Sequence, residues 1–507
     1  MGLFRRRKQP GASNGDEAEE CQRTIAAWSP EERTRKEKAY VRHIDRRLLP
    51  MLILMYILNY IDRNALPHAR LQNLEEDLGL EGYQYNTVLS LTFIGYILMQ
   101  IPSNMILGKT RPSLYLPGCM IAWGVVSGAT GAVQGFSGLA ACRFFLGCTE
   151  APYFAGAAFL FSGWYTKREL GARLGILFCG AMLSGAFAGL FAAGIAAAFK
   201  DNRIASWRWL FIIEGAATVV VALAAMFVIP DWPSTTTWLS EEERQLGIVR
   251  LIEDAGEEDE EITPLQGFVM AMKDGKLWLA VTGQVCVQGV ASLTNFLPTL
   301  VSAFGFGNIH TLLLTAPPYV VAAAVCVGNT YWSDRNNMRS LHMIVPLLFT
   351  VVAIIITMAT VNTGARYFAL MVMVPGSYSC FQVSNAWAAS VAARPKQKRA
   401  TALALSNSLG NTALIWTPYL YPESDGPRYI MAWSVNLALC AIGIGVSLAL
   451  RFILQRANKK MDQREEGRED DAEYAVTGTK QDMTEMEAVQ KSGLGVARFE
   501  KEYRYQI

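Results

Sequence analysis

Long runs of apolar residues recur along this chain and limit what it can fold into more than any other feature. A helix of about 20 residues spans the roughly 30 Å hydrocarbon layer of a bilayer. The composition agrees, because 51% of the 507 residues are hydrophobic and 18% are charged, whereas soluble domains average about 25% charged residues. The sequence predicts an all-α membrane protein with twelve transmembrane helices, near residues 48–67, 86–108, 113–133, 138–161, 170–198, 207–229, 277–301, 311–332, 341–361, 365–391, 399–420 and 428–454.

One polar and acidic stretch divides the predicted helices six and six. Residues 231–276 contain the run "EEDEE" and no apolar run of spanning length. We therefore expect two six-helix bundles joined by a cytoplasmic loop. Charged residues dominate after Arg456, and this composition predicts disorder. The expected parts are a cytoplasmic N-terminal tail (1–47), a first bundle (48–230), the central loop (231–276), a second bundle (277–455) and a cytoplasmic C-terminal tail (456–507).

Basic residues set the expected orientation of the helices. Lys and Arg are concentrated in the loops that share a side with the N-terminus, and such loops face the cytoplasm. Both termini are therefore predicted to be cytoplasmic. The first forty residues show neither the short apolar core nor the cleavage site of a signal peptide. We expect a multi-pass protein that works as a monomer in the lipid bilayer.

Several other function classes are disfavoured by the same sequence. The net charge of +2 offers no basic face for nucleic acid. The "GKT" at Gly108 lacks the glycine that a phosphate-binding loop needs at the position of Ser103. The four histidines are scattered without metal-ligand spacing, and eight of the nine cysteines lie in apolar runs as packing residues. We expect no metal, no cofactor and no enzymatic activity.

Two opposite charges, Asp62 and Arg63, interrupt the first apolar run. A charge in the middle of a bilayer is disfavoured by about 2.5–3.5 kcal/mol on insertion scales. One explanation is that the helix has already ended and both side chains reach the headgroups. The other is that they face a water-filled cavity inside the protein. The second explains their position better, because the residues up to Pro67 would still lie at membrane depth.

The fourth predicted helix carries a second pair of charges, Arg143 and Glu150. They are seven residues apart, or two helical turns, and so share one face. An internal ion pair is the structural alternative, but buried ion pairs often stabilise less than apolar packing does. Arginine binds carboxylates and phosphates bidentately, and a nearby arginine favours the ionised form of an acid. Competition for arginine would therefore link the binding of an anion to the binding of a proton.

Amide side chains in the second half are further candidates. Asn407 and Asn411 are four residues apart in the eleventh helix, and Gln382 and Asn385 are three apart in the tenth. Each pair lies on one helix face. Amides also join neighbouring helices by hydrogen bonds, so a purely structural role is an equal alternative.

These features together resemble the major facilitator superfamily. The resemblance is carried by "NYIDRNAL", "GYILMQIPSN", "RFFLGCTEAPYF", "WRWLFIIEG" and "NSLGN", and it covers about residues 45–455. Within that superfamily the chain is similar to the anion:cation symporter family, and particularly to its fungal allantoate, nicotinate and pantothenate permeases. "NALPHAR" replaces a "NIGNA" run that these permeases commonly have, so the substrate cannot be carried over.

The resemblance implies roles for particular residues. It implies proton coupling for Asp62 and Glu150, and substrate binding or charge balance for Arg63 and Arg143. It implies that Tyr96 and Asn407 line the substrate site, to which we add Asn411 and Gln382 as candidates. The superfamily's gating loop matches after the eighth helix at Gly328, Asp334, Arg335 and Arg339, whereas its counterpart "GKTRP" lacks the acid.

We therefore expect a secondary transporter that carries a small organic anion, such as a vitamin, ureide or sugar acid, together with a proton. The resemblance favours the plasma membrane. Two alternatives stay open from the sequence. One is an exporter of a secondary metabolite by proton antiport, and the other is a transporter-like receptor that binds a nutrient without moving it.

Overall fold

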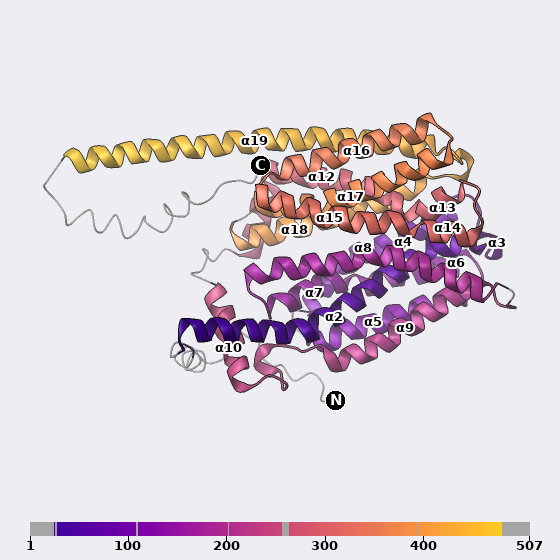
Figure 1. Cartoon of the computed structure of the whole chain (residues 1–507), viewed down its shortest axis with the longest axis horizontal. Helices are drawn as coiled ribbons and strands as arrows, with labels where there is room; N and C mark the ends of the chain where they lie inside the picture. Colours follow the sequence, from indigo (N-terminus) through magenta and orange to yellow (C-terminus); the bar gives the residue numbers. More distant parts are fainter. Residues whose placement is uncertain are drawn as a thin grey trace.

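The computed structural model describes Ile25 and residues 28–107, 110–200, 202–255, 263–392 and 394–478. Across these ranges the chain forms helices and short 3-10 turns and no β-strand. Eight helical stretches within them are long and apolar enough to cross a membrane. The predicted all-α membrane fold is therefore confirmed (Figure 1).

The first group of helices forms the N-terminal bundle, drawn in indigo to magenta (Figure 1). In its core α5 packs on α9, α4 on α6, and α2 on both α8 and α9. A short α3 (Leu74–Asp77) follows α2 and marks one end of the molecule, which we call the α3 end. The helices are α2 (Pro30–Arg70), α4 (Gln84–Leu107), α5 (Pro112–Thr130), α6 (Phe136–Glu150), α7 (Pro152–Ser162), α8 (Lys167–Ala198) and α9 (Ser206–Val228).

The second group forms the C-terminal bundle, drawn in salmon through orange to yellow (Figure 1). Here α12 is central and packs on α17, α18 and α19, while α16 packs on α17 and α19. The helices are α12 (Gly275–Ala291), α13 (Leu297–Ser302), α14 (Asn308–Leu314), α15 (Ala316–Asn336), α16 (Arg339–Ala359), α17 (Thr363–Val391), α18 (Lys396–Trp416) and α19 (Ile430–Gly478), with 3-10 turns at 292–296, 417–420 and 423–425.

Prolines divide two of the predicted spans. Pro152 begins α7 directly after the end of α6, and Pro298 lies at the start of α13 after the 3-10 turn that ends α12. Proline has no backbone N–H to donate, so it is well tolerated in the first turn of a helix and weakens a helix further along. Each of these spans is therefore built from two consecutive helices rather than one.

Two helix ends differ from the predicted boundaries. Helix α2 begins at Pro30 rather than near residue 48, because Ser29 caps it and accepts a hydrogen bond from the backbone N–H of Glu32. Helix α19 continues to Gly478, so the prediction of disorder is wrong for residues 457–478. Residues 479–507 of the same tail lie outside the described ranges, as do most of the N-terminal tail and residues 256–262.

Close glycine contacts join helices within and between the bundles. A Cβ atom on Gly147 of α6 would lie 1.9 Å from the carbonyl oxygen of Thr92 in α4. Between the bundles, a Cβ atom on Gly189 of α8 would lie 2.4 Å from the hydroxyl of Thr315, just before α15. Apolar burial drives helix association little inside a bilayer, so such close packing contributes much of the stability of a membrane protein.

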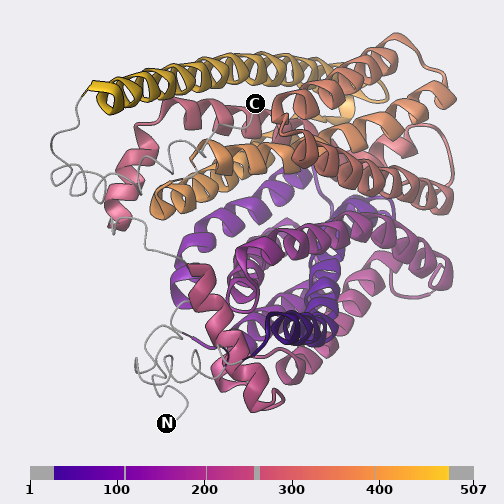
Figure 2. The ribbon, with the colours of Figure 1, turned by 60° about the vertical axis from the view of Figure 1, so that its left-hand side comes forward.

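The two bundles meet in two main places (Figure 2). Helix α8 packs against α14 and α15, and α4 packs against α18. In the second interface Ser408 donates a hydrogen bond to Gln100 over 3.2 Å, and Ser90 donates to the carbonyl of Ile415 over 2.7 Å. At the α3 end Asn308 donates to the carbonyl of Leu71 over 2.7 Å, which links the two bundles there.

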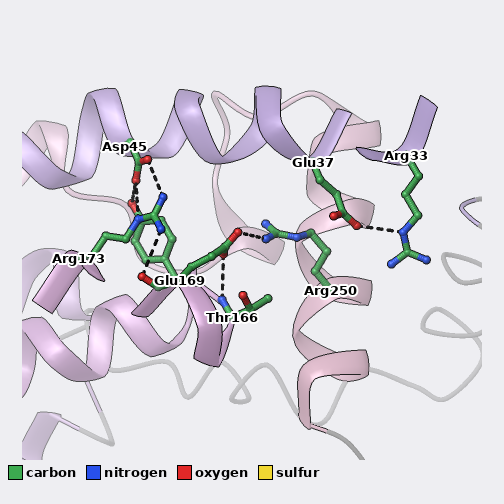
Figure 3. Close-up of polar contacts among 8 residues, drawn as sticks. Arg33, Glu37, Asp45, Thr166, Glu169, Arg173 and Arg250 are labelled. Carbon is green, nitrogen blue, oxygen red and sulfur yellow. Dashed lines mark hydrogen bonds and ion pairs between the residues drawn. The ribbon is translucent and has the colours of Figure 1, made fainter. Parts of the chain in front are cut away.

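The stretch between the bundles, expected as a loop, contains helix α10 (Glu241–Ala255) and helix α11 (Pro264–Met272). Helix α10 lies along the first part of α2, at the end of the N-terminal bundle opposite α3. Arg250 of α10 forms an ion pair with Glu169 of α8 over 2.5 Å, and Arg173 pairs with Asp45 of α2 over 2.8 Å (Figure 3). The first contact ties α10 to the N-terminal bundle, and the second joins α8 to α2 within that bundle.

Candidate functional site

Five charged side chains gather inside the N-terminal bundle, and we call them the buried charge cluster. Exposure is 0% for Asp62, 2% for Arg143, 1% for Glu150 and 2% for Glu214, and the Arg63 side chain is 17% exposed. The residues come from α2, α6 and α9. Because α2 continues beyond Asp62 to Arg70, the explanation that the helix ends and the charges reach the headgroups is wrong.

Asp62 faces the interior of the N-terminal bundle. Its Oδ1 accepts a hydrogen bond from the Ser127 hydroxyl of α5 over 2.8 Å. Its Oδ2 accepts one from the Thr218 hydroxyl of α9 over 3.0 Å. Two hydroxyl donors replace part of the water that the carboxyl group loses on burial. Asp62 is therefore held between three helices and has both of its oxygens satisfied.

Arg63 points to a different neighbour, since consecutive residues of a helix lie about 100° apart. Its Nε and Nη2 both donate to Oε2 of Glu150, over 3.0 and 2.7 Å. The guanidinium also lies 5.3 Å from the ring centre of Tyr60 and 5.0 Å from that of Tyr96, within the range of cation–π attraction. The predicted Tyr96 therefore adjoins the predicted Arg63, and the hydrogen-bonded partner of Glu150 is Arg63 of another helix.

Arg143 lies between Asp62 and α9. Its Nη1 donates to the backbone carbonyl of Asp62 over 3.4 Å, and its guanidinium lies 4.9 Å from the ring centre of Phe211. Nε and Nη2 are buried and make no hydrogen bond to any residue that the structure describes. A buried guanidinium with unsatisfied donors is unfavourable unless opposite charges stand nearby, and both Glu150 and Asp62 interact with it electrostatically.

Glu214 is the member of the cluster that the sequence analysis missed. It lies in α9, which is apolar enough to span a membrane, and its Oε2 is buried without a hydrogen-bond partner in the described part of the chain. A single acid in an otherwise apolar span is a signal that could have found it, because such residues are rare and mark functional positions. Ser127 and Thr218 carry no comparable signal, since hydroxyls are common in membrane helices.

The three amide candidates, Gln382, Asn407 and Asn411, lie in α17 and α18 of the C-terminal bundle. The Asn411 side chain donates to that of Asn407 over 3.2 Å, as their spacing in α18 predicts. Gln382 is half-buried in α17. Among the described residues, none of these three amides hydrogen-bonds to the cluster, and each bundle therefore presents its own set of polar side chains.

The predicted gating loop has one clear ion pair. Arg339 Nη2 lies 2.6 Å from Asp334 Oδ1, and Nη1 donates to the Ser333 hydroxyl over 3.3 Å. Arg335 is exposed, and a Cβ atom on Gly328 would meet nothing within 4 Å.

The counterpart of the gating loop in the N-terminal bundle lies between α4 and α5. Its own sequence lacks the acid, but an acid from another part of the chain lies beside it. Asp231, which follows α9, accepts a hydrogen bond from the backbone N–H of Ser113 at the start of α5 over 3.1 Å. An acid stabilises the positive end of a helix in this position. Gly108 and Lys109 lie outside the described ranges.

No three His, Cys, Asp or Glu side chains of the described ranges lie close enough together to hold a metal ion. The buried charge cluster instead brings together acids and guanidinium groups from three helices of one bundle. The family model described as "Major Facilitator Superfamily" matches residues 52–418. The chain belongs to the major facilitator superfamily.

Curated relatives and solved structures of this superfamily agree. The chain is 31% identical over 438 residues to the MFS-type transporter cnsO of Penicillium expansum, which covers 83% of this chain and 84% of that protein. It is 31% identical over 450 residues to the major facilitator-type transporter hxnP of Emericella nidulans, covering 86% and 89%. A bacterial homologue of the lysosomal transporter Spinster, inward-facing and occupied, matches with a TM-score of 0.60 at 18% identity, covering 80% of this chain and 96% of that one.

Membership of the major facilitator superfamily establishes the general activity. The protein is a multi-pass membrane transporter that carries a small-molecule substrate. The likeness to the bacterial Spinster homologue shows the fold alone, because the two sequences share 18% identity.

Proposed function

We propose that this transporter carries a small organic anion together with a proton, by alternating access between its two bundles. The observation that carries the proposal is the contact between Arg63 of α2 and Glu150 of α6, in which both donors serve one carboxylate oxygen. Among the proposed solutes are vitamins, ureides and sugar acids that bear a carboxylate.

Arg63 supplies the site for the anion. Its guanidinium can bind a carboxylate through two parallel hydrogen bonds, and Tyr60 and Tyr96 hold the guanidinium near their rings. A solute carboxylate competes with Glu150 for the same donors. Arg143 supports binding by keeping a second positive charge near Glu150, and Asn407, Asn411 and Gln382 supply hydrogen bonds from the other bundle.

Glu150 and Asp62 couple the anion to the proton. When the solute takes the Arg63 donors, Glu150 loses its partner while its other oxygen, Oε1, is already buried without one. A buried acid without a partner favours its protonated form. Anion and proton therefore bind together, and the empty and doubly loaded carriers are the forms that change conformation. The Asp334–Arg339 pair, with Gly328 and Arg335, serves as a gate in that change.

The finer assignment follows the sequence resemblance. We assign the chain to the anion:cation symporter family, near the fungal allantoate, nicotinate and pantothenate permeases. The distribution of basic residues supports cytoplasmic termini, and we propose that the protein works as a monomer in the plasma membrane.

Uptake into proteoliposomes tests this function. Purified protein is reconstituted and offered a panel of radiolabelled small carboxylates, with the lumen alkaline relative to the outside. Accumulation that collapses when a protonophore removes the pH gradient is the expected result. Accumulation driven by the opposite gradient would instead support export by proton antiport, and solute binding without flux would support a receptor.

A further inference from the structure

The buried charge cluster holds more acids than guanidinium groups. Asp62, Glu150 and Glu214 supply three carboxyl groups, whereas Arg63 and Arg143 supply two guanidinium groups. An ionised carboxyl group without a counter-charge is strongly disfavoured in an apolar interior, and it becomes neutral by taking up a proton. The count of charges therefore requires one proton inside the N-terminal bundle.

Hydrogen bonds decide which acids share that proton. Glu150 accepts two hydrogen bonds from Arg63, so its charge is balanced in the absence of solute. Arg143 then remains as the counter-charge for both Asp62 and Glu214. One guanidinium group can balance one of these two acids, and the other must be protonated.

Helix α9 brings Glu214 to the same place as Asp62 and Arg143. Phe211, three residues before Glu214, contacts the Arg143 guanidinium, and Thr218, four residues after it, donates to Asp62. Residues three and four apart lie on one helix face, so Glu214 lies between these two contacts. The charged groups that interact with its carboxyl group are Asp62 of α2 and Arg143 of α6, while α5 contributes the hydroxyl of Ser127 to Asp62.

We propose that Asp62 and Glu214 form a proton-binding site inside the N-terminal bundle, in which the two acids hold one proton beside Arg143. This site is separate from the Arg63–Glu150 contact. Its part in transport rests on the proposed function, because Arg143 also interacts with Glu150 and so links the stored proton to the acid that the solute displaces.

Infrared spectroscopy tests the site without any transport. Full-length protein in detergent and free of solute is measured at neutral and at alkaline pH, and the C=O stretch of protonated carboxyl groups is followed. Wild type should show one buried protonated group at neutral pH. Glu214→Gln and Asp62→Asn should each lose it, because the remaining acid then has Arg143 to itself. Arg143→Gln should increase the signal by adding a second protonated carboxyl group, because neither acid then has a counter-charge.

Glu169→Gln serves as the control, because Glu169 lies outside the cluster and pairs with Arg250; it should leave the signal unchanged. Absence of the signal in wild type, or its persistence in both Glu214→Gln and Asp62→Asn, overturns the proposal. If either acid variant fails to fold, Arg143→Gln tests the shared proton instead, and an unchanged signal in that variant overturns the proposal. Binding of small carboxylates to wild type and to Glu214→Gln is measured in parallel. If no carboxylate binds wild type while the infrared signals behave as expected, the proposed transport function fails and the proton site stands.

Discussion

Arg63 of α2 and Glu150 of α6 join two helices through hydrogen bonds of 3.0 and 2.7 Å to one carboxylate oxygen. The two residues are 87 positions apart in the chain, and the Glu150 side chain is fully buried. A contact of this kind is both a structural link and a set of donors that a solute carboxylate can take over. The following predictions test these two properties separately.

Removing an acidic proton acceptor should uncouple the transporter. Glu150→Gln and Asp62→Asn are each expected to abolish accumulation driven by a pH gradient, because neither amide can take up the coupling proton. Exchange of labelled for unlabelled solute at equal pH should be partly retained, since the empty carrier need not return. Both assays use the same proteoliposomes. If both variants concentrate solute as wild type does, the coupling assignment is wrong.

Replacing the guanidinium group of Arg63 should weaken the binding of carboxylates. Arg63→Lys keeps the positive charge but cannot donate two parallel hydrogen bonds. Losing one hydrogen bond to a charged group removes about 1.5–3 kcal/mol, so the Kd should rise by about 10- to 150-fold. Isothermal titration calorimetry in detergent measures it. An unchanged Kd would remove Arg63 from the solute site, and Arg70→Lys, at the α3 end, is the matched control.

A larger residue at Gly147 should separate α4 from α6. A Cβ atom there would lie 1.9 Å from a backbone oxygen, which cannot move out of the way as a flexible side chain can. Gly147→Ala should therefore lower the free energy of unfolding by about 1–3 kcal/mol or more. Thermal unfolding in detergent measures the loss. Gly118→Ala is the control, since nothing lies within 4 Å of a Cβ atom at Gly118, and an equal Tm for both variants would contradict the packing.

The contact between α2 and α10 should depend on pH. Burial raises the pKa of Glu243, but hydrogen bonds from His43 and the backbone of Ser240 outweigh burial and lower it overall. A lowered pKa adds stability that is complete above the ordinary glutamate pKa of about 4.3 and disappears as the pH falls through the lower value. The Tm difference between wild type and Glu243→Gln should therefore be present at pH 5 and shrink as the pH falls below about 4. Glu241→Gln, whose partner Arg244 is on the same helix, controls for the loss of a charge on α10.

The ion pair between Asp334 and Arg339 should contribute modestly to the transport rate. The Asp334 side chain is 57% exposed, and exposed ion pairs contribute about 0–1 kcal/mol. Asp334→Asn should therefore change the transport rate by about fivefold at most and leave solute affinity unchanged. Initial rates in proteoliposomes measure the effect, with Lys459→Gln, an exposed residue of α19 outside the gate, as the control. A complete loss of transport would mean that Asp334 acts in some way other than through this pair.

The membrane fold and most members of the cluster could be predicted from the sequence. Apolar runs of spanning length reveal membrane helices because the bilayer sets their length, and charges such as Asp62 and Glu150 stand out because burial in lipid is unfavourable. The helical continuation of α19 to Gly478 could not be predicted in this way, because charged residues are compatible with both an exposed helix and a disordered chain.

The sequence by itself determined that long helices cross a membrane and that charged groups lie within them, since both follow from the composition of single segments. Only the tertiary structure decided the partners: Arg63 rather than Arg143 donates to Glu150, Asp62 faces Ser127 and Thr218, and Glu214 joins them. The reason is geometric. Adjacent residues of a helix point in different directions, and which helix stands in each direction depends on how the whole bundle packs.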